Sequence, residues 1–256
     1  MNQDEILTSD QEQPEIAFSA KDQLPDLAEF TSTIVHDLQA PLRSLTMFTE
    51  LLAEEYQDKL DEKGQQYLDR ICDSGSRMQG LIEDLLTYSC AGQGEQTWII
   101  VDLNQVVDQV MSDLESAIAE TNAEITVKNL PQVLINPREI HQLFQNIIEN
   151  AIKYSGAETP QIEVTAIAQE QEWLFVVADN GIGIAAEFQS QIFDVFQRLH
   201  PADVYSGSGM GLAICKKIVK RYGGNIWVES AGVKGSTFYF TLPMNTRPQS
   251  PNAKVT

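Results

Sequence analysis

Residues 137–154, whose pattern predicts a helix, carry groups that could bind a metal ion, a phosphate and a flat base. Two amides, an ammonium group and a phenol ring share one helix face: Asn146, Asn150, Lys153 and Tyr154. Amide oxygens suit Mg²⁺, an ammonium group suits phosphate, and a tyrosine ring can cover a base. A polar, solvated face is the plainer alternative, but the apolar neighbours Phe144 and Ile148 predict a helix that is largely packed.

Two glycine-rich segments could complete such a site. Asp179 follows a predicted apolar strand over residues 173–178 and precedes Gly181 and Gly183. A carboxylate there could accept a hydrogen bond from the exocyclic amine of adenine, and the glycines would leave room for the base. Residues 207–212 place three glycines before a predicted helix, where backbone N–H groups favour an anion. Taken alone, residues 207–212 are equally well explained as a surface turn, and the segment after Asp179 is better explained as one.

Three histidines are candidate nucleophiles for phosphoryl transfer. His141 is expected on a helix surface and His200 in an irregular stretch. His36 lies outside the apolar stripe of its predicted helix, so its imidazole is expected to be exposed and mostly neutral. The adjacent Asp37 can accept the second ring proton as charge develops, and Pro41 should weaken the helix beside the histidine.

Residues 26–91 contain two long amphipathic patterns with a break near residues 58–64, which predicts a helical hairpin. Ser74 and Gly75 lie on the second apolar stripe, where the helices could approach closely. Because two such stripes cannot bury each other completely, we expect a second copy to form a four-helix bundle, a homodimer. The alternative is that the hairpin packs on the C-terminal part of the chain.

Strands and helices alternate in the rest of the chain and predict a two-layer α/β sandwich with a mostly antiparallel sheet. Helices are expected over residues 103–120, 137–154 and 209–222. The predicted fold class is therefore a dimeric helical bundle followed by an α/β sandwich. The expected divisions are an acidic flexible leader at 1–27, the helical domain at 28–91, the α/β domain at 97–243 and a flexible tail at 244–256.

Charge and composition exclude several classes of partner. The 256 residues carry 17 basic and 37 acidic side chains, a net charge of −20. Nucleic acid and anionic membrane surfaces require a basic patch, so neither is expected as a partner. No stretch has the length of a membrane span or the pattern of a secretory signal, and three scattered cysteines fit reduced thiols. We therefore expect a cytoplasmic location.

Residues 137–242 resemble the ATP-binding domain of the histidine kinases, the Bergerat fold. Four motifs occur in order: an N box at 145–154, a G1 box at 179–183, an F box at 192–199 and a G2 box at 207–212. The resemblance implies that ATP and Mg²⁺ bind here, with Asn150 and Asn146 as metal ligands. The implied ATP-binding residues are Asn146, Asn150, Lys153, Tyr154, Asp179, Gly181, Gly183, Arg198, Gly207, Gly209, Gly211, Leu212 and Thr237.

The segment that starts at His36 resembles the H box of the dimerisation and phosphotransfer domain, in wording most similar to the phytochrome-type branch. The resemblance covers residues 28–242 and implies an ATP-dependent protein-histidine kinase of a two-component system. His36 and Asp37 would be catalytic, and an aspartate of a response-regulator receiver domain would accept the phosphoryl group. A separate sensor protein is expected as well. Ala40 replaces the Thr or Asn with which many relatives position water, which disfavours phosphatase activity.

Two alternatives stay open from the sequence. The first is a hydrolytic ATPase of the same fold, but such enzymes carry a glutamate one helical turn before the magnesium asparagine. Asn146 stands there, and an amide cannot accept a proton from water. The second is a nonenzymatic dimer that binds a nucleotide or a regulator, against which the complete set of motifs argues.

Overall fold

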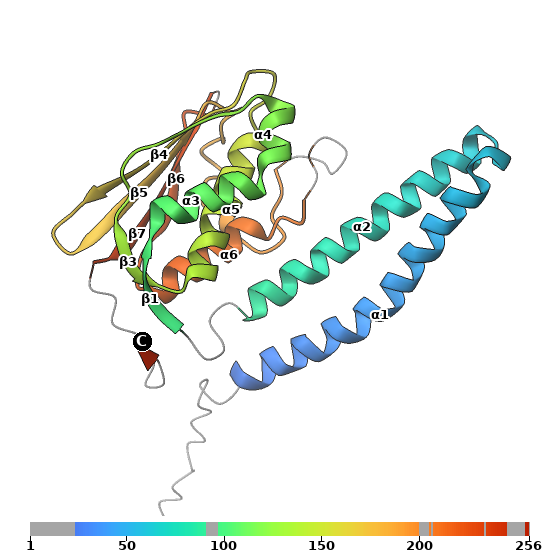
Figure 1. The fold of residues 1–256 in the computed structure, drawn as a ribbon, viewed down its shortest axis with the longest axis horizontal. Helices are drawn as coiled ribbons and strands as arrows, with labels where there is room; N and C mark the ends of the chain where they lie inside the picture. The colour runs from blue at the N-terminus through green and yellow to red at the C-terminus, as the bar shows by residue number, and fades with distance from the viewer. Residues whose placement is uncertain are drawn as a thin grey trace, which may run out of the picture.

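The computed structural model describes residues 24–90, 97–199, 205, 207–232, 234–244 and 254–255. The first part is a helical hairpin of α1 (Leu24–Tyr56) and α2 (Glu62–Cys90), joined through a short 3-10 helix at Gln57–Lys59 (Figure 1). The predicted hairpin and the place of its break are confirmed. Helix α1 continues through Pro41, whose nitrogen cannot donate to the carbonyl of Asp37.

The two helices of the hairpin meet along a narrow buried face. Leu42, Thr46 and Thr49 of α1 are buried there. The Thr46 hydroxyl donates to the carbonyl oxygen of Leu42 at 3.1 Å, and the Thr49 hydroxyl donates in the same way to Leu45 at 2.7 Å. A Cβ at Gly75 would lie 3.1 Å from the hydroxyl oxygen of Thr46. The glycine therefore allows the close approach that its place on the stripe predicts.

Large apolar side chains elsewhere on the hairpin stay exposed in the single chain. Each of ten keeps between 42% and 62% of its surface accessible: Leu38, Leu45, Met47, Phe48, Leu51, Leu52, Tyr56, Tyr67, Ile71 and Met78. Soluble chains rarely expose so much apolar surface unless it forms an interface. Exposed apolar surface of this kind agrees with the second copy that the sequence predicts.

The second part of the chain is a two-layer α/β domain. Its main sheet has the strand order β2-β4-β5-β7-β6, in which only β2 and β4 pair in parallel. The strands are β2 (Glu124–Val127), β4 (Gln161–Ala168), β5 (Glu172–Asp179), β6 (Ile226–Glu229) and β7 (Ser236–Pro243). The helices α3 (Leu103–Asp113), α4 (Glu115–Thr121), α5 (Pro137–Lys153) and α6 (Gly211–Arg221) form the other layer (Figure 1). The predicted order of a helical hairpin followed by a two-layer α/β sandwich is confirmed.

A smaller sheet has the order β3-β1-β8, with β1 (Thr97–Asp102), β3 (Gln132–Ile135) and β8 (Lys254–Val255). Strand β8 pairs in parallel with β1, so two residues of the tail that was expected to be flexible belong to a strand. The leader up to residue 23 and most of the tail lie outside the described residues.

The predicted helix over residues 103–120 is instead two helices that meet at Leu114. The backbone of Leu114, with φ −98 and ψ 11, is not helical, and its N–H donates to the carbonyl oxygens of Val110 and Ser112. None of the helices in the described part of the chain combines the length and the apolar character of a membrane span.

Three phenylalanines fix α5 on the sheet. Phe175 of β5 and Phe240 of β7 stack with their ring centroids 4.7 Å apart. Phe144 of α5 meets both rings edge-on, with centroid distances of 6.2 Å to Phe175 and 5.6 Å to Phe240. All three side chains are fully buried. Edge-to-face and stacked rings have defined geometry, so this cluster sets the orientation of α5 and of its polar face.

Candidate nucleotide-binding site

Helix α5 supplies the candidate site with its polar face. The side chain of Asn136 accepts a hydrogen bond from the backbone N–H of Arg138, and Pro137 occupies the first turn, so the helix begins with a good cap. The opposite face is buried and consists of seven apolar residues: Ile140, Leu143, Phe144, Ile147, Ile148, Ala151 and Ile152. The predicted packed helix is confirmed, and its half-buried polar residues lie at the margin of the core.

Asp179 ends β5, where the sequence predicts that the adenine base binds. One carboxylate oxygen, Oδ1, accepts backbone N–H bonds from Gly181 at 2.8 Å and Ser236 at 3.1 Å. Burial raises the pKa of this carboxyl above its ordinary value, although both N–H donors oppose the shift. An open hollow of about 410 Å³ borders Asp179 and Thr237. No described residue bonds the second oxygen, Oδ2, which leaves it for a donor group of a ligand.

The loop after Asp179 is bonded to the end of α5. A Cβ at Gly181 would lie 2.5 Å from the carbonyl oxygen of Tyr154, so only glycine fits there. The backbone N–H of Ile182 donates to the same oxygen at 2.9 Å. Gly183 has a φ of +77°, in the left-handed region that favours glycine. The structure thus brings the N box and the G1 box together.

Lys153 joins the glycine-rich segment before α6 to the same site. Its ammonium nitrogen lies 2.7 Å from where a Cβ of Gly207 would be, and Gly207 has a φ of +130°. Gly209 has a φ of +76°, and a Cβ there would lie 2.7 Å from the carbonyl oxygen of Gln197. Burial lowers the pKa of Lys153, and the Glu149 carboxylate opposes that shift. A partly desolvated ammonium beside the backbone N–H groups of a glycine-rich segment is suited to a phosphate.

Arg198 and Tyr154 lie on the side of the site that leads to the irregular segment. The Tyr154 ring packs against the ring of Tyr205 with a centroid distance of 4.8 Å, and the ammonium of Lys153 lies 4.9 Å from the Tyr154 centroid. The Arg198 guanidinium donates to the carbonyl oxygen of Tyr205 at 2.7 Å. The predicted cation, Lys153, and the predicted ring, Tyr154, are therefore close together, and the Arg198 guanidinium is hydrogen-bonded to the backbone.

The two predicted metal ligands have different surroundings. Asn146 accepts a hydrogen bond from the Gln142 amide at 2.9 Å and donates to the carbonyl oxygen of Gly211 at 3.0 Å. Its amide therefore attaches the N-terminal end of α6, where Leu212 follows, to α5. No described residue bonds the half-buried amide of Asn150, so Asn150 is the better-placed metal ligand of the two.

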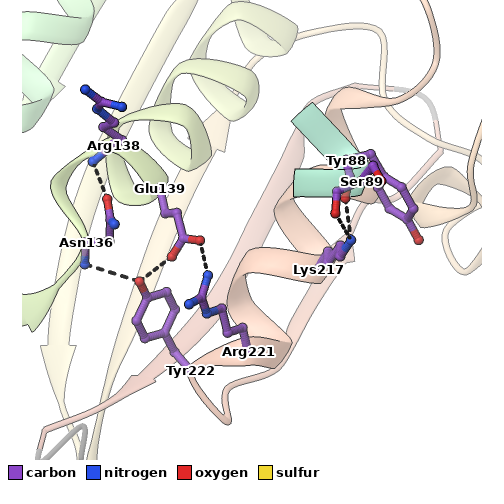
Figure 2. Close-up of polar contacts among 8 residues, drawn as sticks. All are labelled: Tyr88, Ser89, Asn136, Arg138, Glu139, Lys217, Arg221 and Tyr222. Carbon is purple, nitrogen blue, oxygen red and sulfur yellow. Dashed lines mark hydrogen bonds and ion pairs between the residues drawn. The ribbon is translucent and has the colours of Figure 1, made fainter. Parts of the chain in front are cut away.

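The opposite end of α6 is attached to the start of α5 through a buried carboxylate (Figure 2). The Arg221 guanidinium donates to Glu139 at 2.5 Å, with only 16% and 15% of the two side chains exposed. The Tyr222 hydroxyl donates to the same carboxylate and accepts the backbone N–H of Asn136 at 3.2 Å. Both ends of α6 are thus fixed on α5, which positions the glycine-rich segment.

The Arg221→Met substitution should lower the free energy of unfolding by about 3 kcal/mol, because it leaves a buried carboxylate with half of its partners. The matched control is Lys128→Met, which breaks an exposed ion pair with Glu163 at 2.7 Å and should cost less than about 1 kcal/mol. Urea denaturation monitored by tryptophan fluorescence measures both values. Equal losses in the two variants would contradict the assigned role of Glu139.

Ser236, which the sequence motifs did not single out, contacts Asp179 more directly than Thr237 does. Strand β7 pairs Ser236 with Asp179, and alternation turns Ser236 and Phe238 toward the buried face. Thr237 therefore lies on the other face of the strand, at the hollow. The signal available in the sequence is the place of Ser236 directly after Gly235, a glycine with a φ of +70°.

The histidines fall in three different settings. His36 lies within α1, beside an exposed Asp37, although the structure does not describe the His36 side chain. His141 pairs with Asp113 at 2.9 Å, with part of its side chain exposed, as expected for a helix surface. His200 lies outside the described residues.

Fold and site together define a nucleotide-binding domain attached to a helical hairpin that carries a histidine. Residues 26–94 match the family model of the His Kinase A (phospho-acceptor) domain. Residues 135–246 match the model of the histidine kinase-, DNA gyrase B- and HSP90-like ATPases. The chain belongs to the sensor histidine kinases.

The chain is similar to cyanobacterial phytochromes. It is 42% identical over 242 residues to cyanobacterial phytochrome A of Nostoc sp. PCC 7120, which covers 94% of this chain and 32% of that protein. It is 41% identical over 239 residues to the phytochrome-like protein Cph1 of Synechocystis sp. PCC 6803, covering 93% and 32%. The chain thus spans about a third of the length of these relatives.

Two solved structures align with most of the chain. Full-length ShkA in complex with AMPPNP aligns with a TM-score of 0.67 and 26% identity, over 86% of this chain and 47% of ShkA. ThkA in complex with the response regulator protein TrrA aligns with a TM-score of 0.59 over 88% of this chain and 64% of that chain, and at 23% identity it shows the fold alone.

Proposed function

We propose that the chain is an ATP-dependent protein-histidine kinase that phosphorylates itself on His36. The observation that supports this most is the convergence of Lys153, Asp179 and the glycine segment at Gly207 on α5, in a chain whose hairpin matches a phosphoacceptor domain. Nucleotide binding by this domain agrees with the AMPPNP complex of ShkA.

The donors present fit a magnesium nucleotide. The Asp179 carboxylate would accept from the adenine amine, and the glycines would leave the base slot open. Lys153 and the backbone N–H groups of the glycine segment would hold the phosphates. Mg²⁺, when bound, would neutralise phosphate charge, with Asn150 as its protein ligand.

Transfer would then depend on the positioning of His36. A neutral ring nitrogen of His36 attacks the γ-phosphorus, the bond from that phosphorus to the bridging oxygen breaks, and ADP leaves. The positive charge on the imidazole is relieved when Asp37 accepts the proton of the other ring nitrogen. Asn146 offers no general base for water, and its amide is already bonded to Gln142 and Gly211, which disfavours hydrolysis.

A homodimer and a receiver domain are the proposed partners. The exposed apolar side chains of α1 and α2 suit the interface of a four-helix bundle. The structure of ThkA holds a response regulator protein, the class of partner that we propose accepts the phosphoryl group on an aspartate. A separate sensor protein and a cytoplasmic location stay predictions of the sequence.

Incubation of the chain with Mg²⁺ and γ-labelled ATP tests the proposal. We expect protein-bound label that is lost in acid and retained in alkali, the behaviour of a phosphorus–nitrogen bond. A receiver domain added afterwards should remove the label from the chain. Release of free phosphate without labelled protein would indicate the hydrolytic ATPase, and bound ATP with neither product would indicate the nonenzymatic module.

A further inference from the structure

Helix α2 contacts the ATP-binding domain through two polar connections to α6 and the segment before it. The Ser208 hydroxyl donates to the carboxylate of Asp84. The second connection lies one helical turn farther along α2. There the ammonium of Lys217, on α6, donates to the carbonyl oxygens of Tyr88 and, at 3.4 Å, of Ser89 (Figure 2). We call this pair of connections the α2–α6 contact.

The Lys217 connection is explained by the end of α2. The last carbonyl groups of a helix lack partners within the helix and carry its negative dipole end, so a lysine there is favourable. The Lys217 ammonium also lies 4.5 Å from the ring centroid of Tyr88. Since α2 ends at Cys90, this connection lies beside the segment that joins the domains. Its effect is to hold the end of α2 on α6.

The Asp84 connection places an anion at the end of the site that is predicted to bind phosphate. The Ser208 hydroxyl oxygen also accepts the backbone N–H of Met210 at 3.1 Å, directly before α6 begins at Gly211. The half-buried Asp84 is therefore one hydrogen bond away from the positive end of the α6 dipole. The ammonium of Lys153, on α5, lies next to Gly207, which belongs to the same segment as Ser208.

The hairpin places Asp84 at the height of His36. Thr46 of α1 faces Gly75 of α2. His36 lies ten residues before Thr46 on α1, and Leu85 lies ten residues after Gly75 on α2. Because the helices are antiparallel and rise equally per residue, both positions lie toward the same end of the hairpin and at about the same level. The Asp84–Ser208 bond thus holds the phosphate-binding end of the catalytic domain on α2 at the level of the histidine that would receive the phosphoryl group.

We propose that Asp84 competes with the terminal phosphate of ATP for the N-terminal end of α6, so that the triphosphate displaces it from Ser208 and the diphosphate does not. This inference rests on the proposed function. Two anions cannot share one helix end without repulsion, and the charge that distinguishes ATP from ADP is the γ-phosphate. Asp84 is then a positioning residue: the phosphate-binding end of the catalytic domain is released from α2 when ATP binds.

The Asp84→Asn substitution tests the inference, because it keeps a hydrogen-bond acceptor and removes the charge. With Mg²⁺ present, we expect the affinity of the full chain for AMPPNP to rise about tenfold, and its affinity for ADP to change less than twofold. The charge-matched control is Asp73→Asn, on an exposed residue of the same helix. It should change neither affinity.

The Ser208→Ala variant gives a second, independent measurement. It removes the donor that holds Asp84, so it should also raise the ratio of AMPPNP to ADP affinity, and combining it with Asp84→Asn should add little. An unchanged ratio in Asp84→Asn overturns the inference. Failure of the unaltered chain to bind AMPPNP or ADP at all would instead overturn the proposed function.

Discussion

The His36→Gln variant should carry no acid-labile phosphate after incubation with Mg²⁺ and γ-labelled ATP. Glutamine has similar length but no nucleophilic nitrogen, so the loss reports the missing acceptor rather than a changed helix. Position 36 lies inside a helix of 33 residues, in which glutamine is a good helix former. The measurement is label bound to the chain after alkaline electrophoresis.

His141→Gln is the matched control for that experiment. Its imidazole pairs with Asp113 on the surface of the ATP-binding domain, with 26% of the histidine side chain exposed. Loss of such a pair costs at most about 1 kcal/mol, so labelling should be unchanged. Label that persists in His36→Gln, or that disappears in His141→Gln alone, would contradict His36 as the acceptor.

The Asp179→Asn substitution should weaken ATP binding by about 10- to 100-fold, the loss expected when a charged hydrogen-bond acceptor becomes neutral. The amide oxygen can still accept the N–H bonds of Gly181 and Ser236, so the loop should keep its conformation. Isothermal calorimetry with AMPPNP and Mg²⁺ measures the affinity. Glu163→Gln, at an exposed side chain of β4, is the control and should bind normally.

The same substitution should make the folded chain more stable at neutral pH. Burial raises the folded-state pKa of Asp179, so between the ordinary and the raised pKa the folded state binds more protons than the unfolded state. The free energy of unfolding therefore falls as the pH rises through that interval, and the cost is complete above it. Asparagine is neutral throughout.

The difference in unfolding free energy between Asp179→Asn and the unaltered chain should consequently grow in favour of the variant from acid to neutral pH. Urea denaturation at several pH values measures it. A constant difference, or one that shrinks as the pH rises, would refute the assigned cost of burying this carboxylate. Weaker binding together with higher stability would identify Asp179 as a residue retained for the ligand.

The motifs that carry chemistry were predictable because each is local in the chain. The helical spacing of Asn146, Asn150 and Lys153 places them on one face whatever the surroundings. The glycines at 181 and 207 predict that other groups approach the backbone closely there. The structure supports both expectations with named contacts, to the carbonyl of Tyr154 and to the ammonium of Lys153. Amphipathic periodicity likewise predicted the hairpin.

Other features depend on segments that are distant in sequence. Ser236 reaches Asp179 only because β5 and β7 pair in a particular register. Asn146 was predicted as a metal ligand from its helix face and from the family resemblance, yet its amide bonds Gly211, 65 residues away. The division of residues 103–120 into α3 and α4 also has no local breaker, since Leu114 is an ordinary helix former.

The sequence by itself determined which groups we propose for nucleotide binding and which histidine we propose as the phosphoryl acceptor, because residue type and helical spacing are properties of short segments. Only the tertiary structure decided that Asn146 fastens α6, that Glu139 holds its far end, and that Asp84 meets Ser208. Those pairings bring together residues separated by 65 to 124 positions. Their partners are chosen by how the layers pack and by where the hairpin rests, and no local pattern encodes either.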